Sequence, residues 1–139
     1  MAETKSRIMT RGEDTEALLF KNREQGIRRA VKLIDPEAGF DNKSIDMRVN
    51  ELPPGSHSQS HRETKEHIMY ILKGSGYSLI DGEKFEWQEG DVMYIPRWAW
   101  HQYFNTSPDQ YARYLVATNT PMVVNLGLDK KENFTGNKD

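Results

Sequence analysis

The sequence predicts an all-β domain, folded as a β-sandwich or a β-barrel. Short segments in which apolar and polar residues alternate recur along most of the 139 residues, and this alternation is typical of half-buried strands. Frequent turn signals separate these segments, among them Pro53-Pro54-Gly55 and Asp81-Gly82. Many short strands with regular turns indicate a sandwich or barrel rather than a fold of alternating helices and strands.

The N-terminal part holds the clearest helical signal. Residues 1–14 are polar, and we expect them to be loose. Asp14 or Thr15 is suited to cap a short helix through residues 16–20, and Gly26 is suited to end it. The domain is therefore predicted to carry a short helix or arm before its strands.

Strand signals dominate the rest of the chain. In the second predicted strand Ile45, Met47 and Val49 share one face, and polar residues occupy the other. The predicted strands cover residues 28–34, 44–52, 67–73, 77–80, 83–87, 92–95, 100–105 and 111–118.

The end of the chain divides into two parts. Residues 121–128 are apolar, and residues 129–139 are predicted to form a solvated tail. No Ser/Gly-rich or Pro-rich linker interrupts the sequence, so residues 15–128 are expected to form one domain.

Composition limits the possible partners. The net charge of −2 gives no electrostatic reason to expect nucleic acid or an anionic membrane as a partner. The chain has no cysteine, which excludes disulfides and thiolate metal ligands. No apolar leader or membrane-length segment is present, so we expect a cytoplasmic protein. Six tyrosines and three tryptophans in a short chain favour a homodimer, in which residues 121–128 can cover a neighbour's sheet.

Three of the four histidines lie with one glutamate in two regularly spaced stretches. Residues two apart in a strand share a face, so His61 and Glu63 can point inward together. His67 follows at the start of the next strand, and His101 can close the site from another hairpin. The two stretches read Gly55-x5-His61-x-Glu63-x3-His67-x6-Gly74 and Gly90-x5-Pro96-x-Trp98-x2-His101-x3-Asn105.

Three imidazoles and one carboxylate form a ligand set without sulfur. Such a set suits one divalent ion per chain, Fe(II), Mn(II), Ni(II), Co(II) or Zn(II), and the residues alone do not choose among these metals. An octahedral ion would keep about two open positions, as catalytic sites require.

These stretches resemble the paired motifs of the cupin superfamily, G-x5-H-x-H-x3-4-E-x6-G and G-x5-P-x-G-x2-H-x3-N. The resemblance implies a double-stranded β-helix, or jelly-roll barrel, with a metal inside it. Two ligand positions are exchanged, since Glu63 stands where the motif has histidine and His67 where it has glutamate. Trp98 replaces the second glycine of the second motif.

A closer resemblance is to gentisate- and salicylate-type ring-cleaving dioxygenases. His61-Arg62-Glu63-Thr64 and Pro96-Arg97-Trp98-Ala99-Trp100-His101 look like their H-R-H-T and P-x-W-x-W-H stretches. Those enzymes hold Fe(II) with three histidines and no carboxylate, a pattern from which Glu63 departs.

Alternation also predicts the lining of the cavity. If His61, His67 and His101 face inward, Gln59, Met69 and Tyr103 do so too. His57 lies four residues before His61 and is expected to face the same cavity, where His57 or Tyr103 would move protons or orient the substrate. The candidates for binding a substrate carboxylate are Arg48, Arg97 and Arg113.

The leading hypothesis is therefore a mononuclear metal enzyme, and in first place an Fe(II) dioxygenase acting on a small phenolic acid or dicarbonyl. The first alternative is a non-oxidative lyase, isomerase or cyclase, in which the metal polarises a carbonyl. The second alternative is a small-molecule-binding barrel without turnover.

Overall fold

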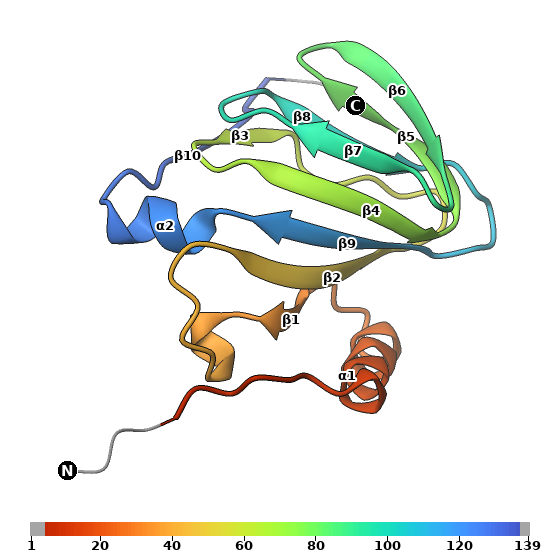
Figure 1. Cartoon of the computed structure of the whole chain (residues 1–139). Helices are drawn as coiled ribbons and strands as arrows, with labels where there is room; N and C mark the ends of the chain where they lie inside the picture. The colour runs from red at the N-terminus through yellow and green to blue at the C-terminus, as the bar shows by residue number, and fades with distance from the viewer. Residues whose placement is uncertain (1–4, 137–139) are drawn as a thin grey trace.

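Two five-stranded antiparallel sheets face each other in this computed structural model, which describes residues 5–136 (Figure 1). The first sheet has the strand order β1-β2-β9-β4-β7, and the second has the order β10-β3-β8-β5-β6. Strands adjacent in sequence repeatedly lie in different sheets. This is the jelly-roll arrangement expected from the sequence.

The strands are short, as the turn signals predicted. Those of the first sheet are β1 (Val31–Ile34), β2 (Asp46–Leu52), β4 (His67–Lys73), β7 (Val92–Ile95) and β9 (Ala112–Thr118). Those of the second sheet are β3 (His61–Glu63), β5 (Ser75–Ile80), β6 (Glu83–Gln88), β8 (His101–Asn105) and β10 (Lys131–Asn133). The helical elements are α1 (Gly12–Glu24), the 3-10 turn η1 (Pro36–Ala38) and α2 (Thr120–Asn125).

The chain ends contain more regular structure than expected. Helix α1 begins at Gly12, within the segment predicted to be loose. Acidic residues in its first turn stabilise the helix, because they lie at the positive, N-terminal end of the helix dipole. The apolar segment 121–128 is partly the helix α2, with Pro121 in its first turn. Within the predicted tail, β10 pairs with β3, although its side chains are exposed. Residues 1–4 and 137–139 of the two predicted end segments lie outside the described part.

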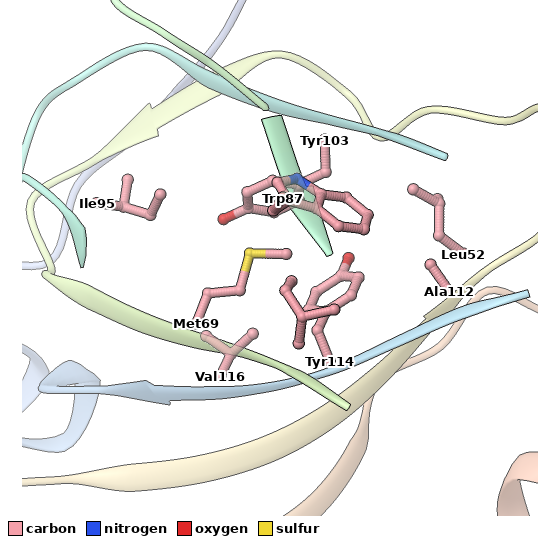
Figure 2. Packing of buried hydrophobic residues seen from close by; sticks show 9 residues of the cluster. Leu52, Met69, Trp87, Ile95, Tyr103, Ala112, Tyr114 and Val116 are labelled. Carbon is pink, nitrogen blue, oxygen red and sulfur yellow. The ribbon is translucent and has the colours of Figure 1, made fainter. Parts of the chain in front are cut away.

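The main core lies between the two sheets. Trp87 and Tyr103 come from the second sheet and meet Met69, Tyr114 and Val116 from the first (Figure 2). The Trp87 indole nitrogen donates a hydrogen bond of 3.0 Å to the Ser78 hydroxyl, so the buried indole N–H is satisfied.

A smaller core covers part of the outer face of the first sheet. Leu19 of α1 packs there against Val31 and Val49. Because α1 covers this face, the apolar residue Val49 points outward from the barrel and the polar residues of β2 point inward. Asp46, Arg48 and Asn50 lie directly opposite Thr118, Val116 and Tyr114 on the inner face of β9.

Among residues 5–136, no helix has both the length and the apolar character needed to cross a membrane.

Candidate metal centre

Three strands bring the predicted metal-binding residues to one end of the barrel. Strand β3 carries His61 and Glu63, and β4 and β8 begin at His67 and His101. His61 and His101 are directly paired across β3 and β8. Residues that pair in this way point to the same side of a sheet, so both imidazoles enter the barrel.

The donor atoms of three residues converge. One ligand atom each from His61, Glu63 and His101 lies within 4.8 Å of the others, and no other such group of histidine and carboxylate donors occurs in residues 5–136. The His61 and His101 rings meet edge to face with centroids 4.4 Å apart. This spacing is close enough for a single ion to bind all three side chains.

The hydrogen bonds of His101 direct one nitrogen toward this convergence point. Its Nδ1 donates to the carbonyl oxygen of Ala99 at 3.0 Å, which leaves Nε2 as the nitrogen with the free lone pair. That Nε2 is buried without a hydrogen-bond partner within the described residues, and the same holds for Nδ1 of His61, Nδ1 of His67 and Oε2 of Glu63. Buried polar atoms without partners are rare in folded proteins, so the arrangement fits a bound metal ion.

Burial also sets the protonation states that a metal needs. It lowers the pKa values of His61 and His67, and it lowers the pKa of His101 to about 4. Burial alone would raise the pKa of Glu63, but the contact with His67 and the charge of Lys65 outweigh it and hold that pKa at about 2. Neutral imidazoles and an ionised carboxylate are the forms that bind metals.

The two oxygens of Glu63 have different neighbours. Oε1 lies 3.5 Å from Nε2 of His61. Oε2 lies 3.0 Å from Nε2 of His67 and 3.7 Å from Nζ of Lys65. His67 thus approaches Glu63 rather than joining the group of three converging donors.

The loop before β8 has an unusual backbone conformation at Trp98. This residue has φ +62°, a left-handed conformation that favours glycine, and its N–H donates to the Glu63 carbonyl oxygen at 2.6 Å. Trp98, which stands where the motif has glycine, therefore takes a backbone conformation that glycine adopts readily. The Arg62 guanidinium lies 4.5 Å from the Trp98 ring centroid and 4.6 Å from that of Trp100, which adds cation–π attraction on this side of the site.

Two residues of the predicted lining face the interior. Met69 is fully buried in the main core, two residues after His67. Tyr103 is buried with its ring centroid 5.7 Å from that of His101. Burial, with smaller effects of nearby charges, raises the pKa of Tyr103 well above its usual range, so its hydroxyl stays protonated and can donate a hydrogen bond.

His57 and Gln59 do not face the cavity, and their expected orientation is wrong. His57 is exposed, and its ring contacts Phe104 and Gln102, on the opposite side of β8 from His101 and Tyr103. Gln59 is also exposed and donates to the carbonyl oxygen of Phe134. Both residues precede β3, so the alternation of that strand does not reach them.

Two of the three arginine candidates, Arg48 and Arg113, lie on opposite sides of the first sheet. Arg48 is half-buried on the inner face of β2 and makes no ion pair within residues 5–136. Arg113 lies on the outer face of β9 and pairs with Glu16 and Glu51 at 2.6 and 3.1 Å. Arg113 therefore attaches α1 to the sheet and does not reach the cavity, which corrects its predicted role. Arg97, the third candidate, is exposed.

Three polar residues near the site were not identified from the sequence as site residues. Lys65 is close to Glu63, Asp46 accepts a hydrogen bond from Thr118, and Asn50 has a buried Oδ1 with no partner among the described residues. The polar face of β2 was visible in the alternation, but the pattern did not show that this face points inward.

Comparison with known proteins identifies the family. The cupin-domain family matches residues 48–118, just over half of the chain and all four predicted metal-binding residues. The chain belongs to the cupin family. The cupin match covers strands from both sheets, including β3, β4 and β8, and agrees with the jelly-roll fold.

Two of the curated relatives of this cupin are enzymes by name. A 5-aminosalicylate 1,2-dioxygenase from Comamonas is 28% identical over 91 residues, which are 66% of this chain and 24% of that protein. A 1-methylthio-D-xylulose 5-phosphate methylsulfurylase from Rhodospirillum rubrum is 32% identical over 74 residues, which are 53% of this chain and 47% of the relative.

Solved cupin structures confirm the fold. A salicylate 1,2-dioxygenase from Pseudaminobacter salicylatoxidans superposes with a TM-score of 0.80 at 15% identity, over 93% of this chain and 41% of that one. The chain thus spans less than half the length of each of these three proteins.

Proposed function

We propose that this cupin is a mononuclear metal-dependent enzyme, and specifically an Fe(II) dioxygenase for a small phenolic acid or dicarbonyl. The observation that carries the proposal is the convergence of one donor atom each from His61, Glu63 and His101, among which Nε2 of His101 is buried without a hydrogen-bond partner in the described residues. Two histidines and one carboxylate with open positions are the ligand set of many non-haem Fe(II) oxygenases. When bound, the iron would supply oxygen activation and polarise the substrate.

The residues that face the barrel interior near the metal centre support a small organic acid as substrate. Arg48 brings a positive charge without an ion-pair partner to the inner wall, where its guanidinium can bind a carboxylate through two hydrogen bonds. Met69 makes the core next to the site apolar. Tyr103 keeps its proton and would donate a hydrogen bond to a substrate oxygen.

The names of the relatives support two candidate reactions. The Comamonas dioxygenase supports oxidative chemistry, whereas the Rhodospirillum methylsulfurylase supports a second candidate, non-oxidative chemistry at a metal that polarises a carbonyl.

Oxygen consumption distinguishes the two candidates. Protein loaded with Fe(II) under anaerobic conditions should consume O2 on addition of a hydroxybenzoate or a β-diketone, in proportion to the substrate lost. The rate of O2 consumption by the His101→Gln variant should be at least 100-fold lower. Metal-dependent conversion of the same compounds without O2 would instead establish the non-oxidative candidate.

We also propose that the chain forms a homodimer through the uncovered part of the outer face of the first sheet. Ile68 lies opposite Tyr94, and Tyr70 lies opposite Val92, on strands β4 and β7, and all four side chains are exposed. These four residues, called the β4–β7 patch, are beyond the part of the face that α1 covers. A twofold axis brings an apolar patch of this kind against its own copy.

A further inference from the structure

We propose that His67 is not a metal ligand in this chain but a positioning residue that holds the distal oxygen of Glu63. The inference rests on the proposed metal site and specifies which of its four candidate donors bind the ion. It assigns coordination to His61, Glu63 and His101 alone.

The first argument is the grouping of the donor atoms. Those of His61, Glu63 and His101 lie within 4.8 Å of one another, and His67 is outside this group. The ring of His67 is also farther from His101 than that of His61, with centroids 5.1 Å apart against 4.4 Å. An ion at the centre of the three converging donors would therefore have His67 beside Glu63.

The second argument is how the partners of Glu63 are divided. Oε1 is directed to the side of His61, where the ion would bind. Oε2 is buried and has no well-aligned hydrogen bond within the described residues, but it lies 3.0 Å from Nε2 of His67 and 3.7 Å from Nζ of Lys65. Electrostatic contact with these two groups on one side of the carboxylate favours binding of the metal through the other oxygen.

The third argument is that His67 has little freedom to move. It is 2% exposed and begins β4, which lies between β7 and β9, where Ile95 and Thr118 are its partners on the two neighbouring strands. Close packing on both sides keeps the imidazole against Glu63. Contacts of this kind around a metal ligand commonly determine its orientation and basicity.

The consequence for the reaction is that fewer protein ligands would bind the metal ion. Four protein ligands would leave an octahedral ion two positions, whereas three leave it one more. A substrate that binds through two oxygens and a molecule of O2 would then fit together. His67 would act on the reaction only through the orientation of Glu63.

Nuclear magnetic resonance of the imidazole nitrogens tests the assignment directly, because the chain has only four histidines. Protein labelled with 15N at histidine is titrated with Zn(II), and the signals are assigned with the variants His57→Gln and His67→Gln. We expect one nitrogen each of His61 and His101 to shift to the position of a metal-bound nitrogen. His67 should keep an N–H toward Glu63, and His57 should not change.

Variants of His67 give a second readout, the dissociation constant of Zn(II). His67→Gln keeps an N–H donor for Glu63 and should weaken binding by no more than about tenfold, whereas His67→Phe fills the space without a donor and should weaken it about 10- to 100-fold. The exposed His57→Gln variant is the matched control and should leave the constant unchanged.

Two results would overturn the proposal in different ways. A metal-bound nitrogen on His67 in the wild-type protein, with equal large losses in both His67 variants, would make it a ligand and leave the proposed enzyme intact. Absence of any histidine shift on addition of Zn(II) would refute the metal site itself. If His67→Gln folds poorly, the signals of His67 are assigned in the wild-type protein by experiments that correlate each imidazole with its own backbone, so the first point is still decided.

Discussion

Glu63 is the residue on which the chemistry of the site depends most. It is buried among three histidines and Lys65, and its pKa stays at about 2 because His67 and the nearby positive charges outweigh the effect of burial. An ionised carboxylate at this position adds negative charge to the metal and strengthens binding of a hard divalent cation.

The lowered pKa values of the site histidines predict how the stability of the metal-free protein depends on pH. Below about pH 6.5 the unfolded histidines take up protons, while folded His101 remains neutral down to about pH 4. Because the unfolded state binds more protons in this range, the free energy of unfolding should fall as the pH decreases from 7 to 4. His101 alone would contribute about 3 kcal/mol at most.

Urea unfolding of metal-free protein between pH 4 and pH 7.5 measures this effect. The His101→Gln variant should show a shallower dependence on pH, and the exposed His57→Gln variant should follow the wild type. Equal slopes for all three proteins would refute the account of His101 as a buried neutral imidazole.

Arg48 should determine affinity for a substrate carboxylate. With Arg48→Gln, the KM for a carboxylated phenol should rise about 10- to 100-fold, because a charged hydrogen-bonded pair is lost. The KM for the same phenol without a carboxylate should change little. Steady-state kinetics on the two compounds checks this, and Arg113→Gln on the outer face is the control. An equal effect on both compounds would contradict the assignment of Arg48.

Which residues meet at the site could be predicted from the sequence, but not every orientation. The spacing of His61, Glu63 and His101 placed them together, because alternation and pairing within strands are regular. The same rule failed for His57 and Gln59, because the chain before β3 is not part of a regular strand. The position of Lys65 depends on the turn between β3 and β4, which spacing does not describe.

Among the elements, β5 and β6 show how tightly the barrel is packed. Gly76 of β5 lies against the Trp87 ring, and a Cβ there would come within 2.0 Å of the Phe104 carbonyl oxygen and 2.8 Å of the ring. Neither the backbone of β8 nor the buried indole can move away easily. Glycine is therefore required at this position by space rather than by its backbone angles.

Gly76→Ala should thus destabilise the protein by about 3 kcal/mol or more, since overpacking of a core is costly. Gly12→Ala is a matched control, because a Cβ there meets nothing within 4 Å, and its effect should stay within about 0.5 kcal/mol. Thermal or urea unfolding of both variants measures the difference. A Gly76→Ala variant as stable as the wild type would mean that β5 and β8 are not packed in this way.

Element positions could largely be predicted from the sequence, since β4 and β7 have the predicted boundaries. The short strand β3 was not assigned, because three residues carry too little periodicity. The inward polar face of β2 was not predictable either, because its other face is covered by α1, a tertiary contact that alternation does not encode.

At the scale of the whole molecule, the uncovered β4–β7 patch predicts self-association. Ile68→Lys places a charge at its centre and should weaken the dimer at least 100-fold, because a buried unpaired charge is costly. Phe20→Lys, an exposed apolar residue of α1, should have no effect. Analytical ultracentrifugation of the wild type and both variants measures this, and a monomeric wild type at all concentrations would refute the dimer.

The central claim, that one divalent metal ion binds to His61, Glu63 and His101, is tested most directly by elemental analysis. Protein purified anaerobically without added metal should contain close to one ion per chain, predominantly iron. His61→Ala should lose the ion, and His57→Ala should keep it. Protein without stoichiometric metal, or with a metal content that His61→Ala does not change, would contradict the account.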